Sequence, residues 1–98
     1  MSHFLYKLTP PRPSFLEDMT PAEATAMEAH FAYWADLIDQ GSVIAYGPVL
    51  DPTGTYGIAI VEADDQEHVN HLGQSDPAVI GGAGTFAVFP MPSTVVRA

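Results

Sequence analysis

The chain has 98 residues, of which 47% are hydrophobic and 15% are charged. Its net charge of −9 makes nucleic acids and anionic membrane surfaces poor partners. The sequence contains no cysteine, which excludes thiol catalysis, disulfide bonds and thiolate metal sites. No apolar run approaches the ~20 residues of a membrane span, and the N-terminal segment lacks a signal-peptide core, so we expect a cytoplasmic protein. The length indicates a single domain, residues 1–98, and the apolar composition favours a partner subunit that covers part of its surface.

A strand is the first element expected, over residues 3–8, where apolar residues recur at every second position. A loop of about eleven residues follows, because Pro10, Pro11 and Pro13 exclude a regular helix or a central strand. Loops of this length in a small domain often have a task, such as covering a site.

A helix is expected to begin after Thr20, because Pro21 and Glu23 complete the pattern of a capping box with proline at the first helical position. Gly41 is a typical C-terminal stop. An apolar stripe follows the helical period: Met27, Phe31, Trp34, Leu37 and Ile38. His30 lies beside this stripe, where a titratable ring needs a partner.

The second half of the chain predicts a hairpin, a helix and further strands. Strands over 42–49 and 56–62 are joined by the turn residues 51–54, so they should be antiparallel neighbours. A second helix should run from an Asp64 cap to about residue 73. Asp76 and Pro77 then begin a short turn. A strand is expected over 85–89 and a possible edge strand over 94–97.

The resulting order, strand, helix, strand, strand, helix, strand, is that of an α+β ferredoxin-like fold, in which two helices cover one face of an antiparallel sheet. The other face would remain open, and an apolar face of that size favours sheet-to-sheet dimerisation. We expect the open face to include Phe4, Tyr6, Tyr56, Ile58 and Phe86.

Several segments resemble one family over nearly the full length of the chain. They are PRPSF with DMTPAE after it, HFAYW in the first helix, GSVIAYGPV followed by DPTG, and SDP. Together they resemble the YCII-related (YciI-like) domain family, whose small ferredoxin-like members pair as dimeric α+β barrels. The resemblance implies a homodimer and an enzyme of unassigned substrate, since most activities in the family are unassigned and one branch removes chloride from a chlorinated hydroxyquinone.

The resemblance also implies an active-site dyad of a first-helix histidine and an aspartate. By position these are His30 and Asp76, with Asp51 as the rival aspartate. Judged from the residues alone, His30 is either a general acid or base oriented by a carboxylate or a histidine packed at the edge of the core. Both aspartates precede proline, where a turn can explain them, and Asp51 ranks below Asp76 because Asp-Pro-Thr-Gly is a complete β-turn pattern.

Arg12 is the candidate for holding negative charge on a substrate, because its guanidinium sits in a rigid proline frame; an ordinary solvated arginine is the alternative. Phe15 would line the same pocket, and Asp51 is a further candidate substrate contact. Trp34 is expected in the core. Tyr46 and Tyr56 would face either the pocket or the dimer interface.

No metal or cofactor is expected. His68 and His71 have a spacing that suits a metal, but no third ligand is evident, so a solvated helix surface is the better interpretation. We therefore expect a cofactor-independent lyase or isomerase that moves a proton on a small aromatic or carbonyl-bearing substrate. The alternative is a non-catalytic dimer that binds a small ligand or acts as an accessory domain.

Overall fold

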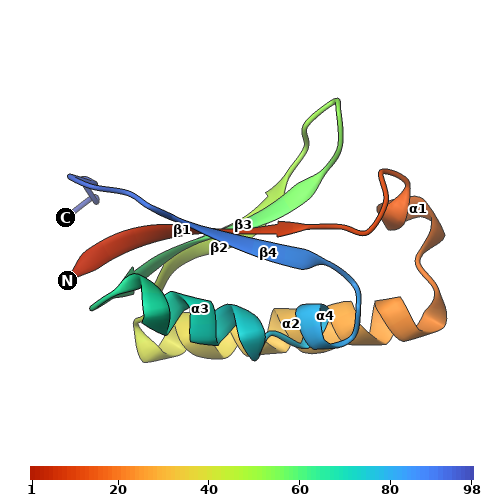
Figure 1. Ribbon diagram of the computed structural model, residues 1–98, viewed down its shortest axis with the longest axis horizontal. Coiled ribbons are helices and arrows are strands. Elements are labelled where there is room, and N and C mark those ends of the chain that lie inside the picture. Colours follow the sequence, from red (N-terminus) through yellow and green to blue (C-terminus); the bar gives the residue numbers. More distant parts are fainter.

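Four antiparallel strands form one sheet in the order β2-β3-β1-β4. The computed structural model describes residues 1–98. Helices α2, α3 and α4 lie on one face of the sheet, and α1 lies beyond its end (Figure 1). The elements are β1 (Ser2–Thr9), α1 (Phe15–Asp18), α2 (Pro21–Gln40), β2 (Val43–Val49), β3 (Tyr56–Ala63), α3 (Gln66–Gln74), α4 (Pro77–Ile80) and β4 (Thr85–Pro90). The predicted α+β ferredoxin-like architecture and the β2–β3 hairpin are confirmed.

Helix α2 has the ends that its sequence predicts. The Thr20 side chain accepts a hydrogen bond from the Glu23 amide, the Glu23 side chain accepts one from the Thr20 amide, and Gly41 closes the helix at φ 87°. Its buried stripe differs from the predicted one, because Phe31 is 53% exposed. The buried residues are His30, Trp34 and Leu37. His30 therefore lies within the buried stripe and not beside it.

The two faces of the sheet are assigned differently from the prediction at three residues. Phe4 and Tyr6 are buried against the helices, and Phe86, half-buried, packs on that side too, since its ring stacks on Tyr6. Tyr56 and Ile58 lie on the opposite, open face, as expected, because they alternate with Gly57 and Ala59, which pair with Leu8 and Tyr6. Phe4, Tyr6 and Leu8 alternate along β1 as predicted, but the pattern alone does not tell which face of the sheet the helices cover.

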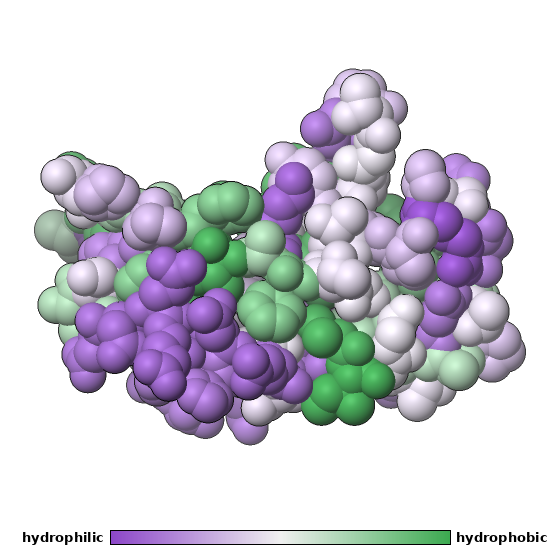
Figure 2. Space-filling model, viewed as in Figure 1, coloured by the Kyte–Doolittle hydropathy of each residue, from purple (hydrophilic) through white to green (hydrophobic).

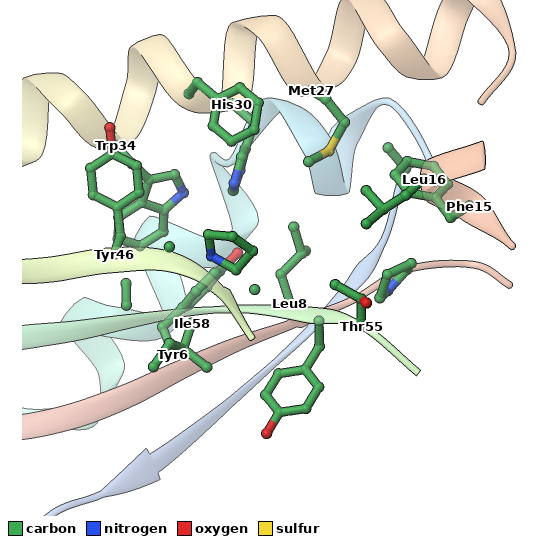
Figure 3. Close-up of a pocket in the computed structure, with 18 of the residues that line it drawn as sticks. Tyr6, Leu8, Phe15, Leu16, Met27, His30, Trp34, Tyr46, Thr55 and Ile58 are labelled. Carbon is green, nitrogen blue, oxygen red and sulfur yellow. The ribbon is translucent and has the colours of Figure 1, made fainter. Parts of the chain in front are cut away.

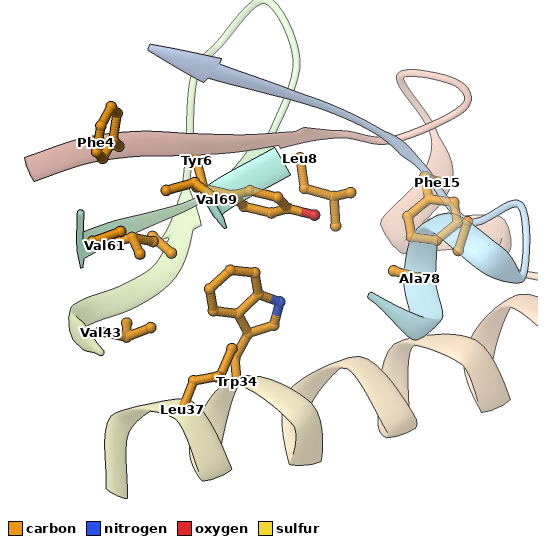
Figure 4. Close-up of a cluster of buried hydrophobic side chains, with 13 residues drawn as sticks. Phe4, Tyr6, Leu8, Phe15, Trp34, Leu37, Val43, Val61, Val69 and Ala78 are labelled. Atoms are coloured by element: carbon orange, nitrogen blue, oxygen red, sulfur yellow. The ribbon is translucent and has the colours of Figure 1, made fainter. Parts of the chain in front are cut away.

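The core lies between the helices and the sheet (Figure 4). Phe15 reaches it from α1, and Ala78 reaches it from α4. Helix α3 packs closely on β4, because a Cβ atom at Gly73 would lie 2.5 Å from the ring of Phe86. The buried apolar residues are Phe4, Tyr6, Leu8, Phe15, Trp34, Leu37, Val43, Ala59, Val61, Ala63, Val69, Ala78 and Ala83.

Three local predictions are wrong. Helix α3 is capped by Asp65, whose carboxylate accepts the His68 amide, and not by Asp64. Residues 15–18 form the short helix α1 inside the predicted loop, because the prolines end before it. Residues 94–97 form no strand; the backbone turns at Ser93, which has φ 60°. No helix is long and apolar enough to cross a membrane.

Candidate functional site

A cavity of about 250 Å³ lies between α2, the α1 segment, the β2–β3 hairpin and the sheet. His30 descends from α2 into its wall, with Met27 and Leu16 farther along toward α1 (Figure 3). Thirteen of the nineteen lining residues are hydrophobic, so the cavity suits a small, largely apolar molecule. The lining residues are Tyr6, Leu8, Pro10, Phe15, Leu16, Met27, His30, Phe31, Trp34, Tyr46, Gly47, Pro48, Leu50, Thr55, Tyr56, Gly57, Ile58, Ala59 and Ala83.

His30 and Asp76 are in direct contact. The Nδ1 atom of His30 lies 2.8 Å from Oδ1 of Asp76 and 3.0 Å from Oδ2. His30 comes from the middle of α2, and Asp76 is the N-cap of α4, where its carboxylate also accepts the amide of Ala78 at 2.9 Å. The Asp-Pro pair thus serves as a helix cap and as the partner of His30 at once.

Asp76 is completely buried and accepts hydrogen bonds from four groups. Besides His30 and the Ala78 amide, the Tyr6 hydroxyl donates to Oδ2 at 2.8 Å, and the indole nitrogen of Trp34 donates to Oδ2 at 2.9 Å. Burial by itself raises the pKa of the Asp76 carboxyl, but the hydrogen bonds from His30 and Trp34 outweigh it and hold the pKa below its usual value. The carboxylate is therefore ionised at neutral pH.

The ionised carboxylate fixes the state of the His30 ring. Because Asp76 can only accept, Nδ1 carries the proton that the pair shares, and neutral His30 has its lone pair on Nε2. Nε2 makes no hydrogen bond within the protein. It is not fully buried by the surrounding side chains, although His30 as a whole is only 8% exposed. His30 lines the cavity, so its basic nitrogen is open to a molecule bound there.

Tyr6 and Trp34 hold the second oxygen of Asp76, a role that the sequence analysis did not assign. Burial and the neighbouring Asp76 charge raise the pKa of the Tyr6 hydroxyl, so it remains a donor. The two rings also pack together, with centroids 4.7 Å apart. The sequence signal was available in principle, because a tyrosine or tryptophan in a core position needs a partner for its polar atom.

Arg12 is not brought to the cavity. Its guanidinium donates to Asp18 through Nε at 2.8 Å and to both oxygens of Glu23 at 2.9 and 2.7 Å. The hydrogen bonds from Arg12 lower the pKa of Glu23 to about 2. Arg12 therefore ties the proline-rich loop to the start of α2. The carboxylates of Asp18 and Glu23 occupy the guanidinium group that was predicted to bind a substrate.

Of the other residues predicted to contact a substrate, some line the cavity and one lies in the β2–β3 turn. Phe15 lines the cavity, as does Tyr46. Asp51 does not, because its carboxylate closes the hairpin turn by accepting the amide and hydroxyl of Thr53 at 2.9 and 2.8 Å. The hydrogen bonds from Thr53 lower the pKa of Asp51. Asp76 and not Asp51 is therefore the aspartate beside His30.

No group of three or more histidine, aspartate or glutamate side chains is arranged to hold a metal. His68 and His71 are exposed on α3, and His71 has only Glu67 nearby, at 3.8 Å. Hydrophilic residues gather over this helix on the molecular surface (Figure 2). The site at His30 itself brings together a buried carboxylate, an oriented imidazole and an apolar cavity.

The model of the YCII-related domain matches residues 4–92. The chain belongs to this family. The match includes His30, Asp76 and all of the sheet except the first two residues of β1. No curated protein sequence matches the chain.

A solved structure shares the fold of this YCII-related domain. It is the 5-chloro-2-hydroxyhydroquinone dehydrochlorinase TftG of Burkholderia phenoliruptrix AC1100 in complex with 2,5-dihydroxybenzoquinone. The TM-score is 0.63 at 22% sequence identity, over 87% of this chain and 89% of the other. At this identity the similarity establishes a common fold.

Proposed function

We propose that this YCII-related domain is a cofactor-independent enzyme of the lyase or isomerase type, in which the His30–Asp76 dyad transfers a proton on a small aromatic or carbonyl-bearing substrate. The single observation that carries the proposal is the pairing of His30 with a fully buried carboxylate at the wall of a cavity. A carboxylate kept ionised behind an imidazole both orients the ring and stabilises the cation formed when Nε2 accepts a proton.

In the proposed step, Nε2 of His30 takes a proton from a substrate hydroxyl or from a carbon next to a carbonyl. The electron pair of the broken bond moves into the conjugated system of the substrate. In an isomerisation, His30 returns the proton at another atom of that system. In an elimination, a leaving group such as chloride departs with its bonding electrons, and His30 later gives its proton to water. Asp76 stays ionised throughout, and Tyr6 and Trp34 keep its carboxylate in place.

The dehydrochlorinase with the same fold supports elimination as the first chemistry to examine. The test uses wild-type protein and two variants, His30→Gln and His68→Gln. Chlorinated hydroquinones are assayed for chloride release, and a panel of phenols and 1,3-diketones is assayed for proton exchange with deuterated water by NMR. A positioned general base accelerates a reaction by about 10²- to 10⁴-fold. The turnover rate of His30→Gln should therefore be at least about 100-fold below that of the wild-type protein.

His68→Gln is the matched control, because His68 is exposed on α3 and outside the cavity, and it should keep the wild-type rate. Full activity in a folded His30→Gln variant contradicts the dyad. Failure of the wild-type protein to act on any compound of the panel while it binds some of them favours the non-catalytic ligand-binding domain.

We also propose that the domain works as a homodimer joined through the open face of its sheet. Leu5, Ile58 and Ile60 lie side by side on this face in the register of β1 and β3. Phe89 of β4 pairs with Leu5 there and is 48% exposed. A second copy would cover these apolar side chains, which no helix of the same chain covers (Figure 1).

A further inference from the structure

The cavity has no positive charge to offer a ligand. None of its lining residues is lysine, arginine, aspartate or glutamate. Lys7 lies with its Nζ atom 4.3 Å from the centre of the Tyr56 ring, and Arg12 is bound by its own acidic neighbours. His30 and the Asp76 carboxylate behind it together carry a charge of −1 when His30 is neutral and zero when His30 is protonated. An anion that entered would lose its hydration with no cation to compensate for it.

The apolar wall continues outward from His30 to the surface. Leu16 of α1, Phe31 of α2 and Leu50 after β2 all line the cavity, yet they are 55%, 53% and 79% exposed. Met27 and Leu16 follow one another from His30 toward α1 (Figure 3). Large apolar side chains gathered at the mouth of a cavity are typical of a site that binds an apolar group. A substituent on the bound molecule would cover them.

We propose that the site selects an uncharged aromatic hydroxyl compound that carries an apolar substituent. Its hydroxyl would donate to Nε2 of His30, its ring would lie in the cavity, and its substituent would run past Met27 to contact Leu16 and Phe31. This substrate class rests on the proposed function, because the nitrogen that binds the hydroxyl is the one that accepts the proton.

Three probes test the proposal by calorimetric or NMR titration of the wild-type protein at pH 7: phenol, and the two longer compounds of similar length, 4-propylphenol and 3-(4-hydroxyphenyl)propanoate. Burial of methylene groups strengthens binding, so 4-propylphenol should bind at least about tenfold more tightly than phenol. The propanoate has nearly the same length, but it should bind no more tightly than phenol, because its carboxylate meets Leu16 and Phe31 in an acidic protein.

Substitutions at the mouth of the cavity test where the propyl group of the ligand binds. Leu16→Ser and Phe31→Ser should each reduce the advantage of 4-propylphenol over phenol by at least about threefold. Ile80→Ser is the matched control, because Ile80 is 71% exposed but does not line the cavity, and it should change neither affinity. Circular dichroism and thermal melting establish that each variant is folded.

The proposal is overturned if the propanoate binds as tightly as 4-propylphenol, if the propyl group brings no gain, or if neither neutral probe binds up to its solubility limit. These outcomes are separate from those of the dyad test. Selection of 4-propylphenol with undiminished turnover in His30→Gln would refute the catalytic dyad and leave the ligand class standing. Tight propanoate binding together with loss of turnover in His30→Gln would refute the proposed ligand class and leave the catalytic dyad standing.

Discussion

Replacement of Asp76 by asparagine tests the buried network at the centre of the site. Asparagine has nearly the same shape, but one of its two terminal atoms is an NH₂ donor. If the NH₂ group replaces Oδ2, it faces Tyr6, whose hydroxyl can rotate to accept, and the indole N–H of Trp34, which cannot accept. If it replaces Oδ1, it faces the Ala78 amide, which cannot accept either. Either orientation leaves one buried donor without a partner.

The single unpaired donor sets the expected loss of unfolding free energy. One unsatisfied buried donor costs about 1–3 kcal/mol, and the hydrogen bonds that remain lose the strength that the charge gave them. We expect the free energy of unfolding to fall by roughly 2–4 kcal/mol in Asp76→Asn. This is a large part of the ~5–15 kcal/mol of a small domain, and it leaves the variant folded at room temperature.

Urea denaturation followed by tryptophan fluorescence measures the loss, with protein concentration held fixed because a dimer would make stability depend on it. Asp36→Asn is the control, since Asp36 is exposed on α2 and makes no side-chain hydrogen bond, and its unfolding free energy should stay within about 0.5 kcal/mol of wild type. A loss in Asp76→Asn no larger than that of Asp36→Asn would refute the assignment of Asp76 as the acceptor of the network.

The pH dependence gives a second readout of the same group. The pKa of Asp76 is lowered in the folded state, so its stabilising contribution is complete above the unfolded value near 3.8 and is lost as pH falls through the lower folded value. The difference in unfolding free energy between wild type and Asp76→Asn should therefore shrink as the pH falls below about 4. A difference that stayed constant or grew below pH 4 would contradict the direction of the shift.

Two further predictions concern Arg12 and the open face. Arg12→Gln should lower the melting temperature and raise the pKa of Glu23 from about 2 toward its ordinary value of 4.5, as followed by NMR titration, whereas an unchanged Glu23 pKa would mean that Arg12 is free to bind a substrate. Ile60→Glu should convert the proposed dimer to a folded monomer in sedimentation experiments, because the added charge would be buried in the interface. Val95→Glu, in the 93% exposed tail position, should leave the oligomeric state unchanged, and a dimer that survives Ile60→Glu would show that this face is not the interface.

Local sequence patterns predicted the elements well where one short-range interaction defines them. The capping box at Thr20 and the glycine stop at Gly41 bounded α2, and the turn residues after Asp51 defined the hairpin. The predictions failed where two adjacent residues offer the same local chemistry. Asp64 and Asp65 can both cap a helix, and it is the Asp65 carboxylate that accepts the His68 amide.

His30 could be singled out from the sequence because it is polar at a helical position among apolar neighbours, and the family resemblance pointed to an aspartate as its partner. Asp76 and Asp51 are both followed by proline, and the turn pattern after Asp51 only ranks it lower without excluding it. The fold distinguishes them, because α4 packs against α2 and brings the Asp76 cap to His30, whereas the hairpin carries Asp51 away to its own turn.

The sequence by itself determined the order of the main strands and helices, both ends of α2 and the histidine, because these depend on interactions between residues a few positions apart. Only the tertiary structure decided which carboxylate meets His30, that Tyr6 and Trp34 hold it, and that Arg12 belongs to the loop and not to the cavity. The physical reason is that a buried carboxylate must collect its hydrogen-bond donors from whatever packs around it. For Asp76 the side chains among those donors lie 42 to 70 positions away in the chain.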